Sequence, residues 1–241
     1  MINRRQFVGG ATIGSAMLLS ACGPSVRDAP RVIASAYDNF YVGTGTQMQG
    51  ALRGAKTIYL AALAIETWAG RSMLSAERQS VPEVTRAALW MGLRVARLDG
   101  AADKLQQVVR TLDHWKASGN NVAGLCVEFA GAAGQNADQQ ALFLRAVRQA
   151  LPRELKLHVT GLATDADGRL TALGNLVDEN IVRFFADGGP ALPPSAYLAA
   201  ATALPFPFRI GLQQGDILPD LTAAHRHALF AGHTVFLVNA R

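Results

Sequence analysis

The stretch VAGLCVEF, residues 122–129, is an apolar run that carries a single carboxylate, Glu128, near its far end. A short apolar run of this kind is typical of a strand that is buried on both faces of a parallel sheet. Cys126 lies in the middle of the run, and we expect it to be a small buried side chain rather than a nucleophile. Glu128 is expected where this strand meets the following loop.

Seven other short runs have the same β-rich apolar character, from about residue 32 to the end of the chain. They are RVIASAY (31–37), TIYLAALAI (57–65), GLRVARL (92–98), LKLHVTGLA (155–163), NIVRFFA (180–186), FRIGLQQ (208–214) and TVFLVNA (234–240). Each of them is predicted to be a strand.

Helical patterns separate these runs. The first spans residues 103–119, and its apolar residues share one face: Leu105, Val108, Val109, Leu112 and Trp115. The second spans residues 136–152, with Asn136 as N-cap, Pro152 as its stop and an expected apolar stripe of Leu142, Ala146, Val147 and Ala150. Further helices are expected over residues 46–54, 82–89, 168–177, 194–203 and 219–231.

Eight strands separated by helices predict an α/β fold whose parallel sheet is covered on its faces. The count indicates a compact (β/α)8 TIM-like barrel, closed or nearly so. The eighth run lies directly before Arg241, so we expect the last helix of the barrel to be missing. The alternative is an open doubly wound parallel sheet, because only a weak helix is expected between the second and third strands.

The first residues, MINRRQFVGGATIGSAMLLSACG, have the order of an export signal. Arg4 and Arg5 resemble the twin-arginine motif, and the apolar stretch after them is too short and too rich in glycine to be a permanent membrane span. The sequence Leu-Ser-Ala-Cys that ends at Cys22 resembles the bacterial lipobox, in which the cysteine thiol is acylated.

This leader predicts the domain organisation. We expect residues 1–21 to be the signal peptide, residues 22–31 a lipidated tether and residues 32–241 a single barrel domain. The acyl chains would hold the protein at a membrane of the cell envelope, on its periplasmic side. Gly23 follows the lipidated cysteine, which favours the outer membrane.

The composition is that of one globular domain. Half of the 241 residues are hydrophobic and 17% are charged, which excludes a disordered chain or a coiled coil. The formal net charge of +5 falls to about +3 without Arg4 and Arg5. Because the basic residues are scattered and do not alternate with aromatic ones, no nucleic-acid partner is expected.

Five short blocks resemble a bacterial family known only as a domain of unknown function, number three-one-four-two. They are VARLDG, GNNVAGLCVEF, LKLHVTGLAT, VDENIVRFF and PFPFRIGLQQG, and the resemblance extends over roughly residues 36–215. It implies a glycosidase-type barrel of a kind that is often exported or lipidated. The residues that match its motifs are Arg97, Asp99 and Gly100, then Thr160 and Leu162, then Asp178 and Glu179.

The fourth strand departs from the family pattern. Members tend to carry Asp-x-Asp there, whereas this chain has Glu128, Phe129 and Ala130. The first acid is therefore kept as a glutamate, and the second is absent.

Active sites of barrels gather where strands end, so polar side chains at those ends are the candidate site residues. Glycoside hydrolysis needs two carboxyl groups, about 5–5.5 Å apart for retention or about 6.5–9.5 Å for inversion. We expect Glu128 to be the principal acid or nucleophile, with Asp99 or Glu66 as its partner. Asp187, Asp216 or the substrate itself, in an acetamido-assisted mechanism, are the alternatives for the second group. The predicted substrate-binding residues are Arg97, which would orient the site, Thr160, Asp187, Gln213 and Gln214. Alternatively, Glu128 caps a helix or pairs with Arg97 across adjacent strand ends.

No cofactor or metal is predicted. His225 and His227 point apart on a helix, and no carboxylate joins them or His233 at a ligand spacing. In GTGTQMQG, residues 43–50, Met48 replaces the third glycine of a dinucleotide-binding loop. The three tryptophans, Trp68, Trp90 and Trp115, are of the type that stacks on sugars, although Trp115 lies on the apolar face of its helix.

The predicted function is that of an exported lipoprotein whose glycosidase-like barrel acts on, or binds, polysaccharide of the cell envelope or its surroundings. The alternative is a non-catalytic barrel that recognises glycan or docks another envelope protein, which the missing second acid favours. A periplasmic protein that carries a cofactor is a third class, suggested by the export route, but the chain lacks a binding motif for one.

Overall fold

In the computed structural model, residues 29–43, 52, 54–77, 86–131, 136–162, 173–183, 185, 194–202 and 205–237 are described. The expected signal peptide with Arg4 and Arg5, and the expected lipidation site Cys22, lie outside these residues, as do Asp187 and most of the expected helix over 46–54.

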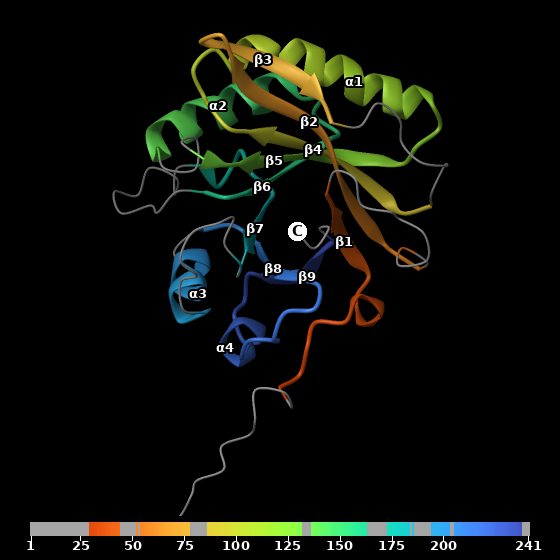
Figure 1. The fold of residues 1–241 in the computed structure, drawn as a ribbon, viewed down its shortest axis with the longest axis vertical. Coiled ribbons are helices and arrows are strands. Elements are labelled where there is room, and N and C mark those ends of the chain that lie inside the picture. The colour runs from red at the N-terminus through yellow and green to blue at the C-terminus, as the bar shows by residue number, and fades with distance from the viewer. Residues whose placement is uncertain are drawn as a thin grey trace, which may run out of the picture.

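The described residues form nine strands, and eight of them close into a parallel barrel (Figure 1). The sheet order is β1-β9-β8-β7-β6-β5-β4-β2-β3, and β1 also pairs with β2. The strands are β1 (Asn39–Val42), β2 (Thr57–Trp68), β3 (Arg71–Ala76), β4 (Ala88–Val95), β5 (Val122–Phe129), β6 (Lys156–Thr160), β7 (Glu179–Arg183), β8 (Phe208–Gln213) and β9 (Phe230–Leu237). The predicted α/β barrel is therefore confirmed, and the open sheet is excluded by the β1–β2 pairing.

The expected first strand over 31–37 is wrong. Residues Ala34–Ala36 form a short 3-10 helix, η2, and the barrel strand begins later, at Asn39. The residues before η2 bond instead to the loop after β8, where the Val32 amide donates to the Asp216 carbonyl at 2.9 Å. Phe40, Tyr41 and Val42 supply the buried side chains that make the later segment the strand.

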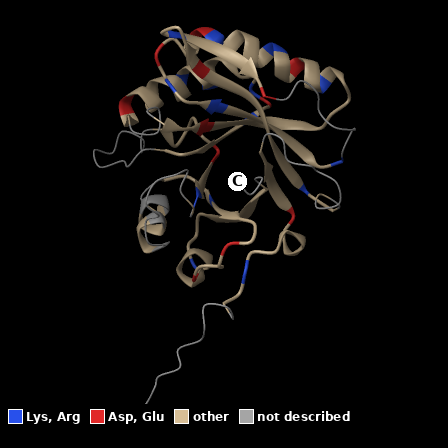
Figure 2. Cartoon of the chain, viewed as in Figure 1, with Lys and Arg blue, Asp and Glu red and all other residues tan. Residues whose placement is uncertain are grey.

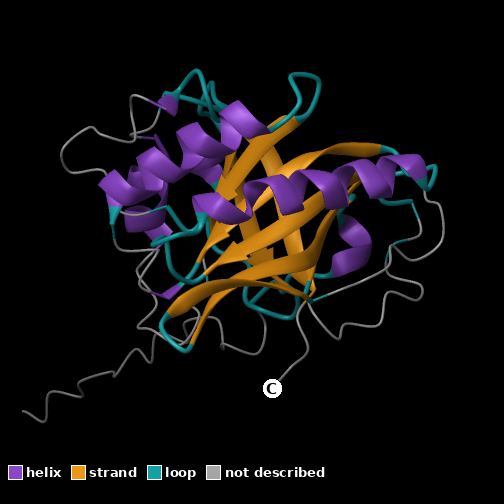
Figure 3. Ribbon diagram, turned by 90° about the horizontal axis from the view of Figure 1, so that it is seen from above, coloured by secondary structure: helices purple, strands orange, loops and turns teal. Residues whose placement is uncertain are grey.

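The barrel carries few helices. They are α1 (Leu105–Ala117), α2 (Ala137–Ala150), α3 (Pro194–Thr202) and α4 (Thr222–His225), together with the 3-10 helix η3 (Ala102–Lys104). Figure 3 shows the two long helices lying over the outer face of the strands. Charged residues of both signs are spread along them (Figure 2).

Three of the expected helices differ from what the structure shows. Residues 88 and 89, expected in a helix over 82–89, begin β4. The described part of 168–177 is a turn, and 219–231 is helical only over α4 before it enters β9. Between β2 and β4 the antiparallel strand β3 follows β2 as a hairpin, so an edge strand lies where a barrel helix is usual.

The two long helices begin as predicted, but α2 buries a different face. The Asn136 side chain accepts a hydrogen bond from the Gln139 amide at 3.0 Å, which confirms the N-cap. Leu142, expected in the apolar stripe, is 63% exposed. The residues of α2 that are buried against the barrel are Gln140, Ala141, Phe143, Leu144 and Val147.

The outward-facing side chains of the strands form the main apolar core with the helices, and the inward-facing ones form a smaller second cluster. That second cluster is largely aromatic and consists of Tyr41, Tyr59, Ala61, Trp90, Cys126, Ile181 and Phe236. Gly124 makes room in it, because a Cβ atom there would lie 2.6 Å from the Trp90 ring. Cys126 is fully buried, as expected, and burial raises the pKa of its thiol well above the usual value.

Replacing Leu144 by alanine should lower the free energy of unfolding by about 2–5 kcal/mol, since it leaves a cavity under α2. The same replacement at the exposed Leu142 should change it by less than about 0.5 kcal/mol. Both residues lie in α2, so helix propensity changes equally in the two variants. Urea unfolding followed by circular dichroism measures the difference, and equal losses would contradict the assigned face of α2.

Candidate functional site at the carboxyl end of the barrel

Glu128 occupies the position that the sequence predicts. It is the second-last residue of β5, the fourth strand of the barrel, and its backbone lies between Arg94 of β4 and Thr160 of β6. The outward neighbours Val127 and Phe129 pack in the main core, so the carboxylate side chain points into the barrel.

Two donors from other strands hold the Glu128 carboxylate. The Tyr41 hydroxyl on β1 donates to Oε2 at 2.6 Å, and the Arg183 guanidinium on β7 donates to Oε1 at 2.9 Å. The side chains of Glu128 and Arg183 are only 11% and 14% exposed, so water screens the ion pair weakly. Burial, followed by the charge of Glu128, raises the pKa of Tyr41 well above its usual value, which keeps this hydroxyl protonated as a donor.

Thr160 lies beside Glu128, and its hydroxyl is buried without a hydrogen-bond partner among the described residues. Such a group is costly in a dry interior and is normally satisfied by water or by a ligand. Thr160 therefore lies beside Glu128 with a fully buried hydroxyl that has no partner among the described residues.

A second polar layer lies towards the amino ends of the strands. Glu179 of β7 forms an ion pair with Arg209 of β8, with its Oε1 atom 2.7 Å from the arginine Nε atom. His158 lies 3.6 Å from the same carboxylate oxygen and 2.9 Å from the Tyr59 hydroxyl. Burial, with the charges of Arg209 and Lys156, lowers the pKa of His158 well below its usual value. These groups fill the barrel interior between Glu128 and the amino ends of the strands.

Asp178 and Glu179, which match the Asp-Glu motif of the resembled family, both make contacts near the amino ends of the strands. Glu179 belongs to the interior layer, whereas the Asp178 carboxylate accepts a hydrogen bond from the Leu157 amide at 2.7 Å. Both residues thus hold strands together in the structure.

Arg97 and Asp99 lie in the loop after β4 and bind each other. Their side chains form an ion pair at 2.9 Å and are 50% and 63% exposed. The partner of Glu128 is Arg183, so the alternative pairing of Glu128 with Arg97 is not observed. The Asp99 backbone carbonyl accepts a hydrogen bond from the Ser72 hydroxyl, which ties the loop to the β2–β3 hairpin.

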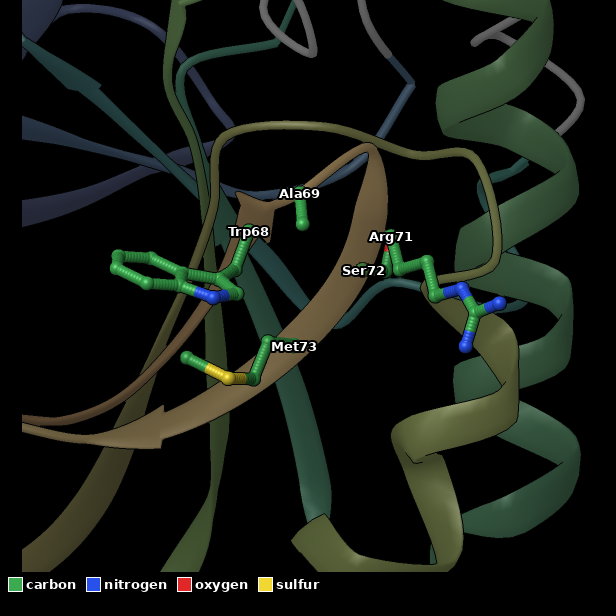
Figure 4. A pocket seen from close by; sticks show the side chains of 5 residues that line it. All are labelled: Trp68, Ala69, Arg71, Ser72 and Met73. Atoms are coloured by element: carbon green, nitrogen blue, oxygen red, sulfur yellow. The ribbon is translucent and has the colours of Figure 1, made fainter.

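Glu66 and Trp68 extend beyond the barrel on that hairpin. The last residue of β2 that pairs with β4 is Ile65, so Glu66, Thr67 and Trp68 project past the carboxyl rim. Trp68 is 71% exposed and Met73 on β3 is 45% exposed. Figure 4 shows their side chains next to each other at a surface hollow of about 500 Å³.

The remaining predicted residues are placed less centrally. Gln213 ends β8 and is half-buried, and Gln214 is exposed, with its backbone amide bonded to the Phe236 carbonyl. Trp115 is buried in the main core, as expected. Trp90 is also buried, inside the barrel against the His158 ring.

Sequence reasoning missed Arg183 and the contact made by Tyr41. Arg183 lies inside the predicted strand NIVRFFA, and a charge within a buried strand requires a partner. That signal was present, but only the strand order, in which β6 lies between β5 and β7, identifies the partner, which is 55 residues away in the chain.

No group of three or more histidine, cysteine, aspartate or glutamate side chains gathers at a metal-binding spacing within the described part of the chain. Among the helices described, none is both long and apolar enough to span a bilayer.

The closed parallel sheet is an α/β barrel of the TIM type. A solved structure of a GH18 chitinase from Pseudoalteromonas aurantia superposes with a TM-score of 0.53 at 12% sequence identity, covering 83% of this chain and 94% of that one. At this identity the likeness establishes the fold alone.

The spore cortex-lytic enzyme SleL of Bacillus cereus matches with a lower TM-score of 0.45 at 14% identity, over 73% of this chain and 50% of that one. The chitinase domain of the spore coat protein CotE from Clostridium difficile matches with a TM-score of 0.43 at 10% identity, over 76% of this chain and 68% of that one.

Residues 84–195 match the family described as "Domain of unknown function (DUF3142)". The resemblance predicted from the short sequence blocks is thereby confirmed over this part of the chain, which is narrower than the range expected. Comparison with curated proteins finds no match to the sequence.

Replacing Arg183 by methionine should lower the free energy of unfolding by about 3 kcal/mol or more, because it leaves Glu128 buried without its cation. Glu128→Gln in the same chain should cost less than the sum of the two single changes, since no charge then remains to be paired. Arg110→Met, which removes an exposed arginine from α1, is the control and should cost little. Additive effects in urea unfolding would show that Glu128 and Arg183 are not coupled.

Proposed function

We propose that this protein is an exported, lipid-anchored protein whose glycosidase-like barrel binds a polysaccharide of the cell envelope or its surroundings without cleaving it. The observation that carries the proposal is Trp68, an indole ring that is 71% exposed on a hairpin beyond the carboxyl rim of the barrel.

Large apolar side chains that lie exposed next to one another mark interaction sites. Trp90 and Trp115 are buried, whereas the Trp68 ring lies free beside Met73 at the surface hollow. An indole ring offers a flat apolar face to a sugar ring and an N–H donor to its hydroxyl groups. Glu66, exposed two residues earlier in the same strand, adds an acceptor on the same face of the hairpin.

The contacts of Glu128 favour binding over hydrolysis. In every glycosidase mechanism considered for this chain, a carboxylic acid gives a proton to the leaving oxygen. A second group then acts as base or nucleophile, and it is a second carboxylate or, in a substrate-assisted mechanism, the acetamido group of the substrate. Both oxygens of Glu128 already accept hydrogen bonds, from Tyr41 and from Arg183. The acid that family members carry two residues further on is replaced by Ala130.

The second candidate function is glycoside hydrolysis with Glu128 as the acid or nucleophile and Glu66 or Asp99 as its partner. The position of Glu128 at the end of the fourth strand, next to the unsatisfied Thr160 hydroxyl, supports it. Of the two partners, Glu66 is favoured because Asp99 is held by Arg97.

Binding to insoluble envelope and extracellular polysaccharides, measured by co-sedimentation, tests the leading proposal. Trp68→Ala should weaken binding to the retained polymer at least tenfold, and Trp68→Phe should restore part of it because a flat ring remains. Leu142→Ala, which removes another exposed apolar side chain, on α2, should leave binding unchanged.

Release of reducing ends from the same polymers separates the two candidates. No release is expected from the wild-type protein. Release that disappears in Glu128→Gln, while binding persists, would replace the binding proposal by the hydrolase.

The anchor is a separate part of the proposal and rests on the order of Arg4, Arg5 and Cys22 in the leader. In a bacterial host that processes lipoproteins, Cys22→Ser should move the protein from the membrane fraction to the soluble fraction and abolish incorporation of labelled palmitate. Cys126→Ala is the matched control, because this thiol is buried in the barrel, and it should leave both readouts unchanged. Palmitate incorporation that survives Cys22→Ser would contradict the anchor.

A further inference from the structure

Two histidines face each other on the outside of the barrel. His225 ends α4, and His233 lies on β9 with its side chain directed outward, like those of Val235 and Leu237 in the main core. Their Nε2 atoms are 3.2 Å apart, and the two rings are nearly perpendicular, at 88°. The sequence spacing of His225, His227 and His233 predicts no metal site, because it takes no account of the turn after α4 that brings His225 and His233 together.

Aromatic neighbours fix the orientation of both rings. The ring of Phe230 lies 5.2 Å from the ring of His225 and 5.2 Å from that of His233, measured between centroids. Tyr37 contacts His233 edge to face at 5.7 Å. The backbone of His225 is held by its amide, which donates to the Leu221 carbonyl at 3.0 Å. The two nitrogen atoms therefore face each other without further rearrangement.

We propose that His225 and His233 together bind a divalent transition-metal ion through their Nε2 atoms. Two nitrogen ligands at about 2.0–2.1 Å from a tetrahedral zinc ion are about 3.3–3.4 Å apart, and two adjacent ligands of an octahedral ion at the same bond length are about 2.8–3.0 Å apart. The observed 3.2 Å falls between these values. Imidazole nitrogen suits Zn²⁺, Cu²⁺ and Ni²⁺, whereas Mg²⁺ and Ca²⁺ prefer oxygen.

The site would be open and exchangeable. Among the described residues, no third histidine, cysteine, aspartate or glutamate completes a ligand set there. Water or a ligand from solution would fill the remaining positions, so the ion would be held more weakly than at a closed structural site.

Titration of the purified protein, without a histidine tag, with Zn²⁺ and separately with Ni²⁺ in a calorimeter tests the proposal. One ion should bind per chain, and His225→Ala or His233→Ala should weaken binding at least tenfold. His114→Ala, which removes an exposed histidine from α1, is the control and should have no effect.

His225→Gln keeps a side chain of similar length on α4 and guards against a loss of binding that comes from misfolding. Circular dichroism should show this variant folded, with metal binding weakened as in His225→Ala. If neither ion binds the wild-type protein, or if the histidine variants bind as tightly as the His114→Ala control, the contact is a simple imidazole hydrogen bond and the proposal is wrong.

Discussion

The four residues of β1 are the constraint on which the rest of the structure depends. This short strand pairs in parallel with β2 on one side and with β9 on the other, and it thereby turns a row of strands into a closed barrel. Closure directs Tyr41 inward and brings its hydroxyl to Glu128 on the opposite wall. The Glu128–Arg183 pair lies on β5 and β7, which β6 joins, and the hydroxyl that β1 supplies completes the set of donors to Glu128.

The sequence was most informative where a segment is buried on both faces. The apolar runs of β2, β5, β6 and β8 were located correctly, and so were the starts and ends of α1 and α2 within about two residues. The position of Glu128 followed from the end of its strand. RVIASAY was misread because its backbone bonds to the loop after β8 at Val32 and then turns through η2 instead of pairing in the sheet, which no local pattern reveals.

Contacts between distant segments were beyond the reach of the sequence. Arg97 lies nearer to Glu128 in the chain than Arg183 does, yet the loop after β4 turns Arg97 towards Asp99 and the barrel interior brings Arg183 to Glu128. Apolar periodicity also predicted that Leu142 lies on the buried face of α2, which is wrong. Gln140 lies on that face, and its side chain donates to the Gly161 carbonyl. Each miss reflects a tertiary contact that overrides a local preference.

The path of the chain into the barrel has a consequence for how the molecule is oriented. Residues 30 and 32 bond to the segment that follows β8, at the rim where the strands carrying Glu128 and Arg183 also end. If Cys22 carries the acyl chains, the polypeptide between it and Arg31 spans at most about 30 Å. The tether would then leave the molecule from the face that holds Glu128. A polymer strand close to the bilayer would lie next to that face.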